Sequence, residues 1–172
     1  GDSRFIKLYW TKKANNELDI AVEVLQSQSN GWVAIGMNPK SGATGMTNTD
    51  IILMSTSPST IQNYFSTRPQ PPSKTSNANL KSIATTMNGG CTTHSFTTPS
   101  LRTTINSATA NWISTNMQFV AVLEPSSSKK PPANGVLTSN QRHSSGGFIK
   151  RSDFHFGIVS KSCPLPQLLT TT

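Results

Sequence analysis

The side chains best suited to hold a metal in this chain are its methionines and histidines. The 172 residues include five methionines and three histidines. Met37 and Met46 flank a glycine-rich connection between two apolar runs, in the stretch GWVAIGMNPKSGATGMTNTDIIL. A thioether is a soft metal ligand, although most methionines fill gaps in a core. The stretch therefore contains two candidate sulfur ligands, and the histidines that could oppose them are His94, His143 and His155.

Hydrolytic, zinc and copper chemistry have little support. The seven acidic residues are spread along the chain, and three of them, Glu17, Asp19 and Glu23, lie on the predicted solvent face of one strand. No G-x-S-x-G, Walker or H-E-x-x-H motif occurs, and neither cysteine has the sequence context of a nucleophile. The histidines and cysteines also lack the close spacing of a structural zinc or blue-copper site.

Haem makes fewer demands on the sequence. An iron porphyrin can be held by two side chains from distant parts of a chain, and methionine with histidine is an established axial pair. The sequence has no C-x-x-C-H motif, which would attach haem covalently. Any haem would therefore be a non-covalent haem b.

The elements that would position such ligands are short strands. Residues 18–25, LDIAVEVL, alternate apolar and polar side chains, as a strand with one buried face does. The segments 66–79 and 124–135 are rich in Pro, Ser, Gly and Asn and are predicted to be exposed loops. These features predict an all-β, antiparallel, immunoglobulin-like β-sandwich. The other candidate strands are 5–10, 32–35, 50–55, 61–65, 80–85, 92–97, 101–106, 117–123 and 154–159.

Composition indicates one extracellular domain. Charged residues make up only 13% of the chain, and Ser, Thr and Asn carry most of its polarity, which is typical of secreted all-β proteins. Cys91 and Cys163 are compatible with one disulfide if the protein is extracellular. No apolar run of 18 residues or signal peptide is present, so we expect a soluble mature form or fragment starting at Gly1, with no membrane span. The domain is expected to cover residues 1–160, with 161–172 as a tail or the start of an interdomain linker.

The net charge of +8 does not predict a nucleic-acid site. The cations occur in scattered pairs, at 12–13, 129–130 and 150–151, without a basic stripe that carries interleaved aromatic residues. A basic surface that attracts an acidic partner is the favoured interpretation.

Three motifs follow one another along the chain: NGWVAIGMNP, then GMTNTDIIL after a glycine-rich turn, and RHSSGGF about a hundred residues later. Their order resembles the DOMON domain family, and within it the haem-binding cytochrome domains of fungal cellobiose dehydrogenases. The resemblance covers most of the chain. It implies a β-sandwich with haem b at one end, in agreement with the strand prediction above.

The resemblance also implies a ligand set. Met46 takes the place of the family's axial methionine and His143 that of its late axial histidine, with Met37 and His155 as alternatives. Trp32 and Phe148 are candidate haem-packing residues, for which ordinary core positions are the alternative. Arg142 and Lys150 are candidate partners for a haem propionate, for which ordinary surface cations are the alternative.

With both axial positions filled by protein, the implied activity is electron transfer rather than catalysis by the domain itself. By resemblance, a monomeric domain would take electrons from a flavin or quinone dehydrogenase and pass them to an extracellular acceptor such as a copper-dependent polysaccharide oxygenase. The alternative is a carbohydrate-binding sandwich without haem, in which Trp10, Trp32 or Trp112 would stack on sugar rings.

Overall fold

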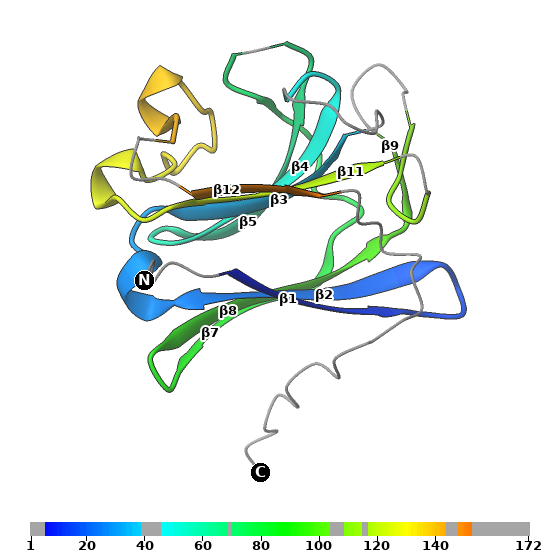
Figure 1. Cartoon of the computed structure of the whole chain (residues 1–172), viewed down its shortest axis with the longest axis horizontal. Helices are drawn as coiled ribbons and strands as arrows, with labels where there is room; N and C mark the ends of the chain where they lie inside the picture. The colour runs from blue at the N-terminus through cyan, green and yellow to red at the C-terminus, as the bar shows by residue number, and fades with distance from the viewer. Residues whose placement is uncertain are drawn as a thin grey trace.

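Two antiparallel sheets stack face to face in the computed structural model (Figure 1). The structure describes residues 6–38, 46–68, 70–103, 109–114, 117–143 and 148–152, with residues 109 and 148–152 described by their backbone alone. One sheet has four strands in the order β1-β2-β8-β7, and the other has six in the order β12-β11-β3-β4-β5-β6. The predicted all-β sandwich is confirmed.

The four-stranded sheet combines the first two strands of the chain with two from its middle. It contains β1 (Ile6–Lys12), β2 (Glu17–Leu25), β7 (Lys81–Asn88) and β8 (Cys91–Pro99). The alternation predicted for residues 18–25 is present in β2, where Leu18, Ile20, Val22 and Val24 face the core. A short 3-10 helix, η1 (Gln26–Gln28), follows β2.

The six-stranded sheet carries the longest buried strands. It contains β3 (Trp32–Asn38), β4 (Thr49–Thr56), β5 (Ser59–Ser66), β6 (Ser73–Lys74), β11 (Gln118–Glu124) and β12 (Phe148–Ser152). A separate two-stranded ribbon pairs β9 (Leu101–Thr103) with β10 (Thr109–Asn111). Two further 3-10 helices, η3 (Ser127–Lys129) and η4 (Ser139–Gln141), lie in the connection between β11 and β12.

The core between the sheets is apolar and contains side chains from both layers. Phe96 of β8 and Ile20 of β2 belong to it from the four-stranded sheet, and Ile35, Met37 and Ile52 from the six-stranded sheet. Removing this apolar surface from water provides most of the drive for the sheets to stack.

Several predicted boundaries need correction. The segment 66–79 is not wholly an exposed loop, because β6 pairs with β5 and Ser66 is buried. Glu124, predicted to begin a loop, is the fully buried last residue of β11, where its carboxylate accepts a hydrogen bond from the Ser126 amide. The predicted strand 101–106 is described only as far as Thr103, and 154–159 lies outside the described residues. The strands β6, β10 and β12 were not predicted.

Candidate functional site

The six-stranded sheet has a second apolar face, turned away from the other sheet. Ile51, for example, is 2% exposed although it points away from the inter-sheet core. Antiparallel sheets commonly expose one face to water. A second buried apolar face, outside the inter-sheet core, is therefore a candidate binding surface. We call this set the outer cluster: Trp32, Ala34, Ile51, Leu53, Tyr64, Val120 and Val122.

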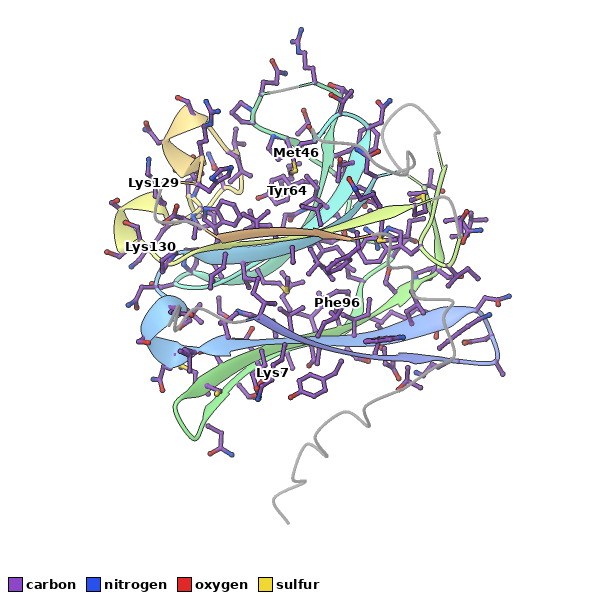
Figure 2. The ribbon with its side chains drawn as sticks, in the orientation of Figure 1. Lys7, Met46, Tyr64, Phe96, Lys129 and Lys130 are labelled. Atoms are coloured by element: carbon purple, nitrogen blue, oxygen red, sulfur yellow. The ribbon has the colours of Figure 1, made fainter. Side chains whose placement is uncertain are left out.

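Met46 packs against the outer cluster. Its side chain and that of Tyr64 lie on the side of the six-stranded sheet away from Phe96, which lies between the sheets (Figure 2). Met37, the alternative sulfur ligand, is fully buried in the inter-sheet core on the opposite face of β3. The two methionines of the glycine-rich stretch therefore lie on opposite sides of one sheet, and Met46 is the one on the side of the outer cluster.

The connection from Pro125 to His143 covers the outer cluster and is tied to it by hydrogen bonds. The Tyr64 hydroxyl donates to the Gly135 carbonyl at 2.7 Å, and the Trp32 indole donates to the Gln141 carbonyl at 3.0 Å. Leu137 adds an apolar contact with the cluster. Burial raises the pKa of Tyr64 to about 12, so its hydroxyl remains a donor at all ordinary pH values.

His143 follows directly from this anchored segment. The short helix η4 begins with a capping box. The Thr138 side chain accepts from a backbone amide of the first turn, and the Gln141 side chain accepts from the Thr138 amide. The Gln141 side-chain amide also donates to the Lys130 carbonyl at 3.3 Å, so the side chain and the backbone carbonyl of Gln141 are both bonded. His143, two residues later, is half-buried, and Arg142 beside it is exposed. The structure thus brings the segment of His143 to the same face of the sheet as Met46 and Trp32.

The remaining predicted site residues are placed less fully. Phe148 is the first residue of β12, opposite Leu123 of β11, and only its backbone is described. His155 and Cys163 lie outside the described residues, so the alternative ligand and the disulfide with half-buried Cys91 stay predictions. No group of three His, Cys, Asp or Glu side chains gathers at one point within the described ranges.

His94 is part of the core and bonded there. Its Nδ1 lies 2.9 Å from the Thr85 hydroxyl, and its side chain is 1% exposed. Burial lowers the pKa of His94 to about 4, so the ring is neutral at pH 7. The hydrogen-bonded structural role predicted for this residue is what the structure shows.

The outer cluster supplies the kind of apolar surface that a haem-binding site requires. A porphyrin has two large apolar faces, and the cluster offers branched and small side chains over β3, β4 and β11. Gly36 belongs to the same face, and a Cβ placed on it would lie 3.2 Å from Val120 Cγ1 and 2.9 Å from the Asp50 carbonyl. A thioether and an imidazole, both uncharged in their binding forms, complete a donor set suited to iron porphyrin.

The charges of the described residues are unevenly distributed. Three acids on the four-stranded sheet form ion pairs: Glu23 with Lys7 at 3.3 Å, Asp19 with Lys13 at 3.2 Å and Glu17 with Lys81 at 2.6 Å. Glu124 and Asp50 are buried. The hydrogen bond from Lys81 contributes most to lowering the pKa of Glu17. The accessible acids that the structure describes are therefore neutralised on the four-stranded sheet.

The connection over the outer cluster is basic. It carries Lys129, Lys130 and Arg142, and Lys74 of β6 donates to the Asn134 carbonyl at 3.2 Å. Figure 2 shows Lys129 and Lys130 at one end of the six-stranded sheet, and Lys7 beyond the other sheet. Lys129, Lys130 and Arg142 thus place positive charge on the face with Met46 and His143, whereas Lys7, Lys13 and Lys81 are paired with acids of the four-stranded sheet.

The outer cluster itself was missed by the sequence prediction. Its signal is the lack of alternation in WVAIGM, DIILM and FVAVL, because a strand buried on both faces reads as a continuous apolar run. The anchoring roles of Tyr64 and Gln141 have no comparable signal, since they depend on partners 71 and 109 residues away in the chain.

Comparison with known structures supports the fold. The cytochrome domain of Myriococcum thermophilum cellobiose dehydrogenase is similar with a TM-score of 0.55 and 16% identity, over 88% of this chain and 76% of that one. The cytochrome b domain of pyranose dehydrogenase from Coprinopsis cinerea is similar with a TM-score of 0.55 and 18% identity, over 90% of this chain and 82% of that one. No curated protein sequence matches this chain at a significant level.

The sequence itself matches one family. The match to the DOMON domain runs over residues 2–117, which includes Trp32, Met37, Met46 and the strands on both sides of them. His143 lies beyond it. The match spans well over half of the chain and agrees with the sandwich described above, so this chain belongs to the DOMON domain family.

Proposed function

We propose that this domain is a b-type cytochrome that holds one haem b between Met46 and His143 and relays single electrons. The observation that supports this most is that Met46 packs on the outer cluster and that the segment leading to His143 is bonded to Trp32 of the same cluster through the Gln141 carbonyl. Both structural neighbours are named as cytochrome domains.

When bound, haem would supply a one-electron iron couple. Met46 would contribute the soft thioether, which favours the reduced state and raises the reduction potential, and His143 would contribute the imidazole. Trp32 orients the histidine segment through its indole hydrogen bond. Exposed Arg142 would pair with a propionate, and Phe148 would lie beside the group. Because the chain itself would supply both ligands, the proposed activity is relay rather than catalysis.

The proposed redox partners are inferred from the two similar cytochrome domains and from the basic connection over the outer cluster. The neighbours are cytochrome domains of two dehydrogenases, so a flavin or quinone dehydrogenase is the proposed donor. The proposed acceptor is a copper-dependent polysaccharide oxygenase outside the cell. An acidic surface on either partner would be drawn to the basic connection, at a rate that falls as salt rises. We propose a secreted monomer with 1–160 as the domain and 161–172 as its tether. No helix in the described ranges is long and apolar enough to cross a membrane.

The structure gives the carbohydrate-binding alternative no stacking platform of the expected kind. Trp32 and Trp112 are buried, and Trp10 is half-buried against the inter-sheet core. A sugar-stacking ring must present an open face to solvent. The three tryptophans therefore favour the cytochrome proposal over the alternative.

Haem titration of matched variants tests the proposal. The intact chain should bind one haem and give a low-spin, six-coordinate spectrum. Met46→Leu and His143→Ala should each lose that spectrum, because each removes one ligand. Met37→Leu and His94→Gln are the controls, since both residues lie in the inter-sheet core, and they should keep it. An unchanged spectrum in Met46→Leu, or its loss in Met37→Leu, would overturn the ligand assignment.

A further inference from the structure

Met46 begins a tight turn that leads into β4. The Thr49 amide donates to the Met46 carbonyl at 3.2 Å, and Asn48 has a φ of 57°. Asparagine tolerates this left-handed conformation better than most residues, so the turn suits its sequence. The backbone position of Met46 is therefore tied to the start of β4 at Thr49.

Asn38 fastens the same turn to the end of β3. Its side-chain amide donates to the Thr47 carbonyl at 2.8 Å and to the Thr49 hydroxyl at 3.1 Å. Asn38 is 5% exposed and Thr49 is fully buried, so these bonds have little competition from water. The register pairs Met37 with Asp50, which places Asn38 beside Thr49 at the last step of the ladder.

The two hydrogen bonds of Asn38 lie on the face of the sheet that the proposed haem would use. Along β3, Trp32 and Ala34 belong to the outer cluster, and Asn38 follows them at the same alternation. On β4, Thr49 precedes Ile51 of the cluster by two residues and shares its face. The amide of Asn38 thus joins the two strands at the end of the cluster where Met46 packs.

We propose that Asn38 is a positioning residue for Met46, holding the turn so that the sulfur stays directed at the iron. The inference rests on the cytochrome proposal above. The two bonds of Asn38 join the end of β3 directly to the turn that begins at Met46. A methionine held in this way resists displacement by an external ligand.

Imidazole competition on the haem-loaded ferric protein measures that resistance. Asn38→Ala removes both bonds and should raise the apparent affinity for imidazole about tenfold, which corresponds to about 1.4 kcal/mol. Thr49→Val removes only the hydroxyl acceptor in an isosteric side chain and should raise it about threefold. The reduction potential of Asn38→Ala should fall. A thioether stabilises the reduced iron, and weaker ligation by the sulfur reduces that stabilisation.

Asn77→Ala is the matched control. The Asn77 side chain also makes two hydrogen bonds, to the Ile61 carbonyl at 3.0 Å and from the Asn63 amide at 2.8 Å, but neither reaches the turn. It should lower stability in urea and leave imidazole affinity unchanged. Equal imidazole affinities for Asn38→Ala, Thr49→Val and the parent would overturn the positioning role, as would an equal rise in Asn77→Ala. Failure of the parent chain to bind haem would instead overturn the cytochrome proposal. Thr49→Val decides the matter alone if Asn38→Ala does not fold.

Discussion

Replacing Asp50 by alanine should destabilise the fold more than replacing any other paired acid that the structure describes. Asp50 Oδ2 accepts from Arg102 Nε at 2.6 Å and from the Trp112 indole at 2.7 Å. Arg102 also donates to Thr98 and, at 2.6 Å, to Asn63, and its guanidinium lies 4.9 Å from the centroid of the Trp112 ring. Asp50 and Arg102 are each 3% exposed. The pair is buried and surrounded by hydrogen-bonding partners.

Asp50→Ala leaves a buried guanidinium without its counter-charge and an indole without its acceptor. Breaking a buried pair from one side costs about 3–5 kcal/mol, a large share of the roughly 5–15 kcal/mol that stabilises a typical domain. Asp19→Ala is the control, because it removes a partly exposed pair with Lys13 and a hydrogen bond from the Thr97 hydroxyl at 2.6 Å but leaves no buried charge unpaired. That change should cost about 1–2 kcal/mol.

Urea unfolding followed by tryptophan fluorescence and by circular dichroism measures both values. The double replacement Asp50→Leu with Arg102→Met should recover much of the loss, since it removes both charges together. A cost for Asp50→Ala within the range of Asp19→Ala would refute the reasoning that burial makes this pair critical.

Three further outcomes follow from the core, a strand junction and the proposed ligand. The depressed pKa of His94, about 4, means that the folded state resists protonation while the unfolded state does not; stability should therefore fall as pH drops below about 6.5, by about 2 kcal/mol at pH 5 relative to pH 7. In urea titrations at the two pH values, His94→Gln should reduce this dependence of the free energy of unfolding on pH. An unchanged dependence would show that other groups cause it. Gly31→Ala should prevent folding, because its Cβ would lie 1.9 Å from the Glu124 carbonyl oxygen, and a normal melting temperature would show that the strands can separate there. Met46→Leu should bind carbon monoxide in its ferrous haem form much faster than Met37→Leu; equal rates would argue against Met46 as a ligand.

The sandwich could be predicted because its strands carry local signals. In β2 the period-2 pattern shows one buried face, and the short segments between Pro- and Gly-rich stretches predict many strands. β12 was missed because FIKRS has little alternation or apolar content, and its partner β11 lies far away in the chain. Such pairing is set by tertiary contacts rather than by local propensity.

The candidate site could be predicted only in part. Alternation along β3 places Met37 and Trp32 on opposite faces, but it does not show which face is the inter-sheet core, because both faces are apolar. The buried pair of Asp50 and Arg102 joins residues 52 apart, for which the sequence has no local signal. The approach of the His143 segment to Trp32 depends likewise on a bond across 109 residues.

The most direct test of the central claim is a visible absorption spectrum of the intact chain after haem has been offered, first oxidised and then reduced with dithionite. A Soret band with sharp α and β bands on reduction is the predicted result, because a thioether and an imidazole hold haem iron low-spin and six-coordinate. A spectrum that equals that of free haem would contradict the account and leave Met46 an ordinary methionine on the outer cluster.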